Sequence, residues 1–425
     1  MRHALQRQSN SLLAALDIGT TKITCIIAEE RADKNAHIIS IGQYRAQGIK
    51  SGLIVNMEAA QNSIKHAVHE AEKMAGERIS TVIASLSSGR ITSNIIPIEI
   101  PIAGDIIHQQ HIKRILTQAR QAVSGLQKDG SHRYALHAFP LEFTVDNERG
   151  ISDPRGMTAQ LFSSPIHVVT ANLGAVQNLT RCIEACRLKV SGIIASPIAS
   201  ASAVLSQEEK DLGCTLIDIG GGTTNLAIYH GGTPVYTEVF PIGGRHITSD
   251  IATVLPTTLP FAEELKTKQG SATTQKDSEQ KIIKAPLVTD PQARDYKQIR
   301  LNLVHDIIAA RVEEIFDEIA QRLETPAIKS FAGRRVVLTG GVSKLPNLCD
   351  VATYKLQRES RIARNTQKIT SQFELDAAHS TSAGLICYAL RSGGWQTSDE
   401  REKTHSKFSL LSSQPMGQLR RILGL

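Results

Sequence analysis

Two copies of one short motif lie far apart in this chain, and they constrain its fold more than any other feature. The first copy reads LLAALDIGTTKITCIIA from Leu12 to Ala28, and the second reads TLIDIGGGTTNLAIYHGG from Thr215 to Gly232. In each copy an apolar run ends in Asp-Ile-Gly, a turn of glycine and threonine follows, and a second apolar run begins. Short apolar runs bounded by glycine are typical of strands joined by tight hairpins. The repetition predicts an α/β fold that is duplicated.

The turns of the two copies have the composition of a phosphate-binding site. A glycine turn exposes consecutive backbone N–H groups and lets them approach an anion closely. Two such turns facing each other would hold a polyphosphate from both sides. At the strand ends, Asp17 and Asp218 are placed to bind Mg²⁺ through water on that phosphate. The predicted phosphate-binding residues are Gly19, Thr20, Thr21 and Lys22 in the first copy, and Gly220, Gly221, Gly222, Thr223 and Thr224 in the second.

The repetition, rather than either turn alone, favours a nucleotide site. A single turn of this kind is also an ordinary glycine hairpin. Neither copy is a P-loop, because that motif needs a lysine further along and a helix immediately after it. Lys22 follows Gly19 by three residues, and the ITCII that comes next has the pattern of a strand.

A third glycine turn supports the same site. Arg334 to Leu348 reads RRVVLTGGVSKLPNL, which predicts a strand that ends in Gly340 and Gly341, followed by a helix start. We expect Ser343 to cap that helix. A Gly-Gly turn lets the backbone lie flat against a purine ring, although a plain strand-to-helix connection would have the same pattern.

These three turns together resemble the superfamily of actin, the heat-shock chaperones and the sugar kinases. Within it, the chain most resembles the FtsA family of bacterial cell-division proteins, from about residue 11 to residue 392. The motifs that carry the resemblance are LGCTLIDIGGGTTNLAIYHGG, PIGGRHITSDIA, FAEELKTKQGSA, SPIASASAVLSQEEKDLG and ISDPRGMTAQL. The resemblance implies a ribonuclease-H-like, actin-like fold of two lobes, with ATP and Mg²⁺ in the cleft between them. It also implies a small α+β insertion in the first lobe, which is characteristic of the family.

The resemblance and the change of sequence texture after Ser80 suggest a division of the chain into subdomains. The expected parts are a first-lobe core of residues 1–82 and 164–205, an inserted subdomain of 83–163, a second-lobe core of 206–244 and 313–392, a second-lobe small subdomain of 245–312, a flexible linker of 393–414 and an amphipathic helix of 415–425. Within the small subdomain, the polar stretch from Lys266 to Arg300 is expected to be a loop.

The resemblance also implies nucleotide contacts for two charged residues, and it implies that the site hydrolyses ATP poorly. Glu263 and Lys266 lie three residues apart, and the resemblance implies that they contact ribose and adenine; a solvated ion pair is the alternative. Ser196 stands where heat-shock chaperones carry a glutamate, and neither Ala201 nor Ser202 can replace the water-positioning glutamine of actins. We expect slow ATP hydrolysis at most, and a rate above about 1 s⁻¹ would instead indicate a true phosphotransfer enzyme.

Composition limits the class of protein. The formal net charge is +7, but the basic residues are scattered and no nucleic-acid-binding module is present, so no nucleic-acid partner is predicted. The six cysteines show no metal-ligand spacing and are expected to be free thiols. Lacking a secretion signal and a long apolar run, the sequence predicts a soluble protein of the cytoplasm.

The C-terminal residues have the pattern of a membrane anchor. After a polar, charged stretch comes MGQLRRILGL. On a helix, its apolar side chains fall within an arc of roughly 120°, and two arginines lie outside the arc. Such a stripe is typical of a helix that lies in the membrane plane, whereas a frayed tail or a helix docked on its own lobe are the alternatives. The residues concerned are Met416, Leu419, Arg420, Arg421, Ile422 and Leu423.

Taken with the resemblance, these features predict an actin-like, ATP-binding protein that polymerises on the cytoplasmic face of the inner membrane at the division site. Its expected partners are anionic lipids, other copies of itself, other division proteins and the C-terminal peptide of the tubulin-like protein FtsZ, which it would anchor. The FtsZ peptide would bind within about residues 244–312. The alternatives are an FtsA-like pilus assembly protein and, less favoured, an ATP-dependent kinase or chaperone of the same superfamily.

Overall fold

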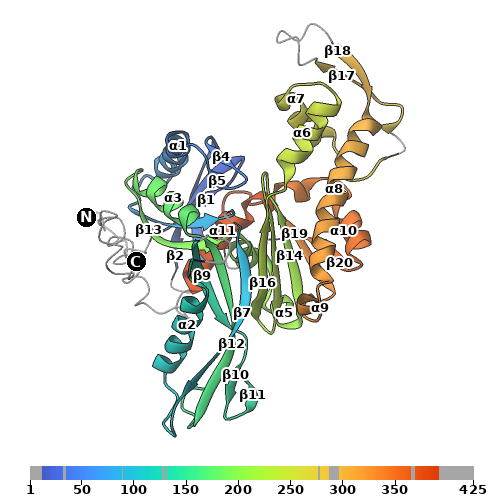
Figure 1. Ribbon diagram of the computed structural model, residues 1–425. Coiled ribbons are helices and arrows are strands. Elements are labelled where there is room, and N and C mark those ends of the chain that lie inside the picture. The colour runs from blue at the N-terminus through green and yellow to red at the C-terminus, as the bar shows by residue number, and fades with distance from the viewer. Residues whose placement is uncertain are drawn as a thin grey trace, which may run out of the picture.

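A computed structural model gives the fold of this chain (Figure 1). It describes residues 12–31, 35–88, 90–126, 130, 132–275, 278–286, 296–364 and 369–391. The linker expected at 393–414 and the helix expected at 415–425 lie outside the described residues. No helix among the described residues is long and apolar enough to cross a membrane.

The first lobe is built on a six-stranded sheet with the order β13-β6-β1-β2-β3-β21. β1 and β2 form an antiparallel hairpin, β2 and β3 are antiparallel, and β6 lies parallel to β1. Helix α1 packs on β2 and β3, and α3 contacts β13. The bounds are β1 (Leu12–Ile18), β2 (Lys22–Glu30), β3 (Ala36–Arg45), α1 (Met57–Ala75), β6 (Thr81–Leu86), α3 (Leu173–Glu184), β13 (Lys189–Ala195) and β21 (Ile369–Ser371), with a small ribbon of β4 (Ile49–Lys50) and β5 (Leu53–Ile54).

The second lobe repeats this topology in the order β16-β15-β14-β19-β20. β14 and β15 are the antiparallel hairpin, and β19 lies parallel to β14, as β6 does to β1. The α/β duplication that the repeated motif predicted is confirmed by this equivalence. The bounds are α5 (Gln207–Leu212), β14 (Cys214–Ile219), β15 (Thr224–His230), β16 (Thr233–Phe240), α9 (Pro326–Lys329), β19 (Arg335–Thr339), η2 (Gly341–Lys344), α10 (Leu348–Leu356) and β20 (Glu359–Ile362).

Two helices, α4 (Ser196–Val204) and α11 (Ser380–Arg391), cross between the lobes. All nine residues of α4 are buried, as expected for an apolar helix in a protein interior. Ile198 and Ala199 belong to the first-lobe core, whereas Ala201 belongs to a cluster with second-lobe strands. The helices are very close, since a Cβ atom on Gly384 would lie 1.8 Å from the carbonyl oxygen of Ala199. Each helix therefore contributes to the cores of both lobes.

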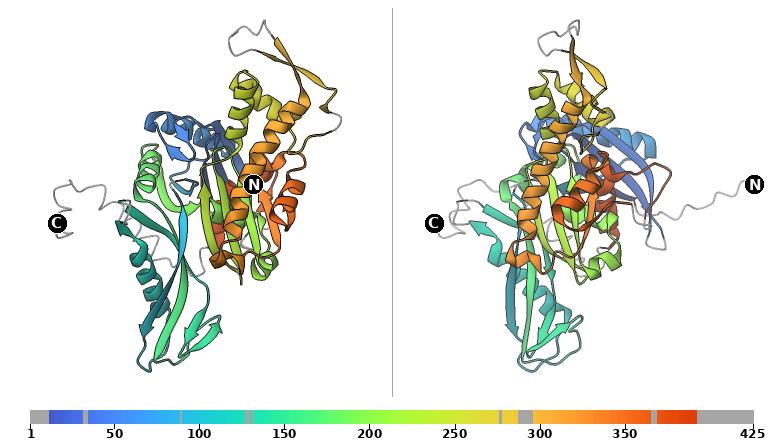
Figure 2. Two further views of the ribbon diagram at one scale, coloured as in Figure 1. Left: turned by 45° about the vertical axis from the view of Figure 1, so that its right-hand side comes forward. Right: turned by 90° about the vertical axis from the view of Figure 1, so that its right-hand side faces the viewer.

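An inserted α+β unit extends from the first lobe, away from the second-lobe helices α6 (Gly244–Val254) and α7 (Leu259–Gln269) (Figures 1 and 2). Its long strand β12 pairs with β7, β9 and β10, and α2 packs on this sheet around a separate apolar core. The bounds are β7 (Thr92–Pro101), α2 (Gln109–Val123), β8 (Gly125–Leu126), β9 (His132–Pro140), β10 (Phe143–Val145), β11 (Glu148–Ile151) and β12 (Leu161–Asn172).

The expected limits of this insertion fall inside strands. The limit at 82–83 lies within β6, which is a strand of the first-lobe sheet, and the limit at 163–164 lies within β12. Residues on both sides of each limit have strand-forming character, as in TVIASL of β6 and LFSSPIHVVTAN of β12, so the sequence texture did not mark the boundaries.

A smaller helical unit stands on the second lobe, at the upper right of Figure 1. It contains α6 (Gly244–Val254), α7 (Leu259–Gln269) and the long helix α8 (Leu301–Leu323). The expectation of a loop from Lys266 to Arg300 was wrong for much of that stretch. Strands β17 (Ile282–Pro286) and β18 (Tyr296–Arg300) form an antiparallel pair there, in which Ile283 lies opposite Ile299.

Candidate nucleotide site

The two hairpins place their aspartates at equivalent positions. Asp17 pairs in register with Thr24, and Asp218 pairs with Asn225. Both turns close with the same hydrogen bond, from Gly19 N to Lys22 O at 3.1 Å and from Gly220 N to Thr223 O at 2.9 Å. The same local sequence has thus produced the same local geometry twice.

The two turns lie against each other across the boundary between the lobes. A Cβ atom on Gly221 would lie 2.3 Å from Cγ2 of Thr21, and one on Gly222 would lie 2.5 Å from Oγ1 of Thr20. Only glycine allows this approach. The backbone N–H groups of both turns are concentrated in one place, but a triphosphate between them would require the lobes to move apart.

Asp218 is buried and Asp17 is partly buried, and this environment affects the ionisation of both. Burial raises the pKa of Asp17 to about 6; the hydrogen bond from Ser85 Oγ at 2.6 Å opposes this shift, and the charge of Asp218 adds to it. Burial likewise raises the pKa of Asp218, against hydrogen bonds from Ser200 and Asn225. Two carboxylates that disfavour each other's charge are suitable ligands, directly or through water, for a divalent cation.

The raised pKa of Asp17 predicts that this residue destabilises the nucleotide-free fold at neutral pH. The folded state binds the proton more tightly than the unfolded state, so stability falls as pH rises between about 4 and 6. Asp17→Asn keeps an acceptor for Ser85 and removes the charge. We expect it to raise the free energy of unfolding at pH 7.5 by about 1–2 kcal/mol, a figure reduced for partial solvent screening. Urea unfolding at pH 7.5 and pH 4.5 checks this, and an equal gain at both values would contradict it.

The residues predicted to bind adenosine surround the second turn. The N-terminus of α6 donates to it, from Gly244 N to Gly220 O at 2.9 Å. Lys266 Nζ donates to Gly244 O at 3.0 Å and pairs with Glu263 Oε2 at 2.7 Å. The lysine is buried in this pair, whereas the Glu263 side chain is 48% exposed.

The Gly-Gly turn differs in part from the expectation. Gly340 has a left-handed φ of 86° and lies against Asp218, and no atom outside the turn lies within 4 Å of a Cβ built on Gly341. Ser343 does not cap the following helix. The turn continues as the 3-10 helix η2, so the Ser343 hydroxyl donates back to Gly340 O at 2.7 Å and α10 begins at Leu348.

Some predicted residues are engaged in local structure. The Thr20 hydroxyl accepts from Gly52 N at 2.9 Å, and the Thr224 hydroxyl donates to Ile242 O at 2.8 Å. Thr223 is buried beside the turn. The membrane residues from Met416 to Leu423 lie outside the described part of the chain.

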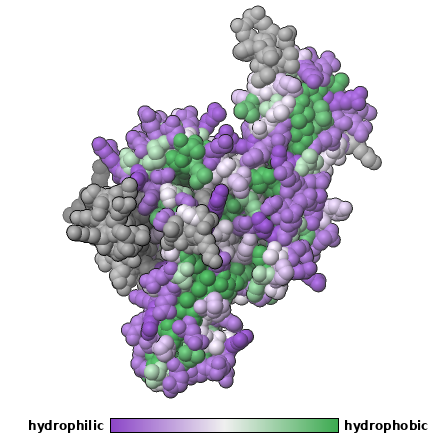
Figure 3. All heavy atoms as spheres, viewed as in Figure 1, coloured by the Kyte–Doolittle hydropathy of each residue, from purple (hydrophilic) through white to green (hydrophobic). Residues whose placement is uncertain are grey.

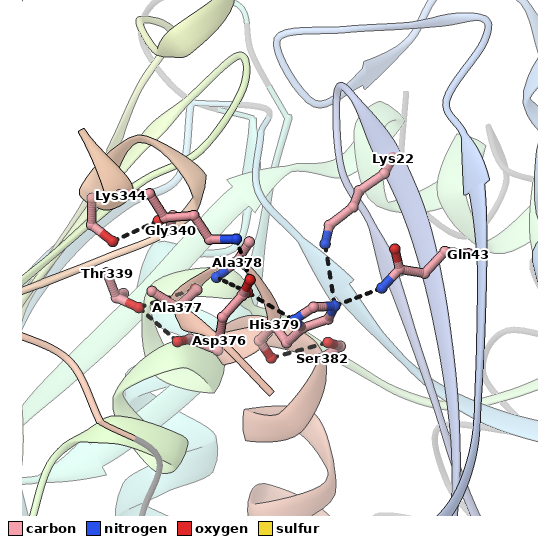
Figure 4. Close-up of polar contacts among 12 residues, drawn as sticks. Lys22, Gln43, Thr339, Gly340, Lys344, Asp376, Ala377, Ala378, His379 and Ser382 are labelled. Carbon is pink, nitrogen blue, oxygen red and sulfur yellow. Dashed lines mark hydrogen bonds and ion pairs between the residues drawn. The ribbon is translucent and has the colours of Figure 1, made fainter. Parts of the chain in front are cut away.

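Several residues of the site could not be found by motif. Ser200 on α4 and Thr381 on α11 both donate to Asp218 Oδ2, at 2.6 and 3.2 Å. Figure 4 shows a second group, in which Lys22 points to His379 and Lys344 points to Asp376. The spacing Asp-x-x-His, which is usual at a helix start, was the available signal for the last two residues.

One cavity of the second lobe lies elsewhere. It has a volume of about 460 Å³ and is found where β14 and β19 begin, at the opposite end of these strands from the turns. Its lining residues are Leu212, Gly213, Lys329, Ser330, Gly333, Arg334, Arg335 and Arg358. It belongs to neither hairpin, and we place the candidate site at the turns because the aspartates and glycines meet there.

Comparison with solved structures identifies the fold as actin-like. The PilM–PilN type IV pilus biogenesis complex aligns with a TM-score of 0.63 and 17% identity over 89% of this chain and 98% of that chain. MreB5 of Spiroplasma citri bound to ADP aligns with a TM-score of 0.55 and 15% identity over 91% and 97%. At these sequence identities, the similarity shows only that the folds are alike.

Comparison with sequences identifies the family. The model of "Cell division protein FtsA" matches residues 215–384, and that of "SHS2 domain inserted in FTSA" matches 88–170. Cell division protein FtsA of Agrobacterium fabrum is 34% identical over 90% of this chain and 88% of its own length. That of Pseudomonas aeruginosa is 32% identical over 96% and 95%, and that of Bacillus subtilis is 31% identical over 90% and 84%. The chain belongs to the FtsA family of cell division proteins.

Proposed function

We propose that this protein binds Mg-ATP between its two lobes, polymerises on the cytoplasmic face of the inner membrane at the division site, and anchors FtsZ there. The observation that supports nucleotide binding best is the meeting of the two hairpins, with Asp17 and Asp218 in equivalent register and the glycine turns in contact. The N–H groups of the turns would bind the phosphates, and Mg²⁺ would neutralise their charge between the two carboxylates.

The nucleotide would act by selecting one arrangement of the lobes. Phosphates between the turns contact both lobes at once, so they favour whichever separation suits them. A defined separation presents the same surfaces on every copy, which is what a polymer requires. Hydrolysis would be slow, since Ser196, Ala201 and Ser202 are buried on α4, and Ser202 Oγ donates to Ile198 O rather than facing a water.

FtsZ would bind the helical unit of the second lobe. Several large apolar or aromatic side chains are exposed there, and Figure 3 shows green areas among purple ones on this unit. They are Val254, Leu259, Ile282, Tyr296 and Leu303. Exposed apolar groups on one unit favour a protein- or peptide-binding role for it.

The terminal helix would attach the polymer to the membrane. Four partly inserted apolar side chains contribute about 1–2 kcal/mol each, and each arginine adds about 1 kcal/mol on anionic lipid. Ordering a short segment opposes much of this, so a single copy binds weakly. Copies linked in a polymer gain about 10²–10⁴ in avidity, so membrane binding would depend on assembly.

Deleting Met416–Leu425 is expected to abolish flotation of the protein with anionic vesicles in the presence of Mg-ATP, and FtsZ should then no longer float with it. The double variant Arg420→Gln, Arg421→Gln is the matched control. It should weaken flotation with anionic vesicles and leave flotation with neutral vesicles unchanged. Undiminished flotation of the deletion variant would contradict the anchor and favour recruitment by a membrane partner, as in the pilus alternative.

A further inference from the structure

A series of polar contacts connects the first phosphate turn with the Gly-Gly turn of the other lobe (Figure 4). Lys22 Nζ lies 3.4 Å from His379 Nε2, and His379 Nδ1 lies 2.9 Å from Asp376 Oδ1. The other oxygen of Asp376 pairs with Lys344, the last residue of η2. Lys22 begins β2 of the first lobe, so this series of contacts crosses the boundary between the lobes.

The partners of His379 fix its tautomer. A carboxylate can only accept, so Nδ1 of His379 carries the hydrogen and donates it to Asp376. Nε2 is then an acceptor with a single lone pair, for which two donors compete: Gln43 Nε2 at 2.5 Å and Lys22 Nζ at 3.4 Å. Asp376 is itself held by Ala378 N at 2.9 Å and by Lys344, so the imidazole cannot turn without breaking these contacts.

Without His379, Lys22 would have a competing partner. The charge of Asp17 acts on the Lys22 ammonium, and both residues flank the first turn. An ion pair between them would occupy the ammonium that a phosphate needs and the carboxylate that a hydrated Mg²⁺ needs. The acceptor nitrogen of His379 gives the ammonium an alternative partner, which is itself linked through Asp376 to Lys344 of η2.

We propose that His379 is a positioning residue that holds Lys22 for the phosphate chain of a nucleoside triphosphate. Through Asp376 and Lys344, it links the position of Lys22 to the Gly-Gly turn, which is proposed to lie beside the base. The same set of contacts would then affect binding of both the phosphates and the base. Breaking the contacts at one end would weaken binding at the other. This inference rests on the proposed function, because it specifies how the same nucleotide site is organised.

A double-mutant cycle tests the assignment in the full chain. His379→Ala and Lys22→Ala should each weaken Mg-ATP binding about tenfold, the range for a hydrogen bond to a charged group. Together they should be no worse than Lys22→Ala alone, since both remove one interaction. His379→Gln places an amide oxygen near the position of Nε2 and should restore affinity to within about threefold of the original protein. The exposed His69→Ala is the control and should change nothing.

Additive effects of the two alanine variants, or a glutamine variant as weak as His379→Ala, would overturn the proposal. A ligand-free measurement separates this from failure of the nucleotide site itself. The charge of Lys22 lowers the pKa of His379, so Lys22→Ala should raise that pKa in an NMR titration of labelled histidines. If the original protein fails to bind Mg-ATP, the proposed function is wrong. Separately, an unchanged pKa of His379 in Lys22→Ala would overturn the contact between Lys22 and His379.

Discussion

Replacing Gly384 by valine is expected to lower the free energy of unfolding by about 4 kcal/mol or more, enough to remove most of the stability of a typical domain. Gly384 lies in α11 where this helix crosses α4, and a Cβ atom there would meet the Ala199 carbonyl oxygen at 1.8 Å and its carbon at 2.4 Å. These are backbone atoms of a fully buried helix, so no side-chain rotation can relieve the overlap.

The effect would spread because the crossing serves both lobes. Pushing α11 away from α4 separates Ala383 from the second-lobe cluster and Leu385 from the first-lobe core. Urea unfolding of the purified protein measures the loss. The control is Gly174→Val in α3, where the nearest atom is a side-chain oxygen of Asn172 at 3.1 Å, and this variant should change stability by less than about 1 kcal/mol. Equal unfolding midpoints for the two variants would show that the crossing tolerates a larger residue.

Asp218→Asn is expected to weaken Mg-ATP binding at least about 100-fold, or ~2.7 kcal/mol, while the fold survives. The carboxylate is surrounded by hydroxyl groups of Ser200 and Thr381, and an asparagine oxygen can still accept from them. What the substitution removes is the negative charge that faces the cation. Since burial already disfavours that charge, its loss should leave the stability of the nucleotide-free protein equal or higher.

Titration calorimetry with and without Mg²⁺ measures this effect. Asp218→Ala should give the same loss of binding. Glu264→Gln, which neutralises an acid in an exposed pair with Lys268, is the control and should bind as the original protein does. Tight binding by Asp218→Asn that still depends on Mg²⁺ would contradict the cation role of this residue.

The sequence was informative about the fold wherever the determining interactions are local. Each Asp-Ile-Gly hairpin is specified within one short segment by two apolar runs and the glycine turn between them, and two such hairpins are enough to identify the duplication. The helix α8, Leu301–Leu323, is local in the same sense, because its buried apolar residues recur every three or four positions. The loop expected at 266–300 failed because the pairing of Ile283 with Ile299 joins residues across a polar stretch.

The sequence was less informative about the site, whose contacts are made between distant segments. Asp17 and Asp218 could be named because each belongs to a motif. Their partners could not, since Ser85 comes from the next strand of the sheet and Thr381 from the C-terminal helix. The same holds for His379, which reaches Lys22 across 357 positions of sequence. The pairing of β6 with β1 brings Ser85 to Asp17, and the packing of α11 on α4, β1 and β2 brings the C-terminal segment to the turns.

The edge strand β21 has a consequence for how the protein is made. It pairs with β3, joining Ile369 to Ala36, so the sheet nearest the N-terminus is finished by a segment near the other end. A nascent chain emerging from the ribosome can form the inserted unit and the second hairpin before this strand has been translated. The first sheet cannot be completed until then, and we expect chains that stop early to remain open at β3 and available to chaperones.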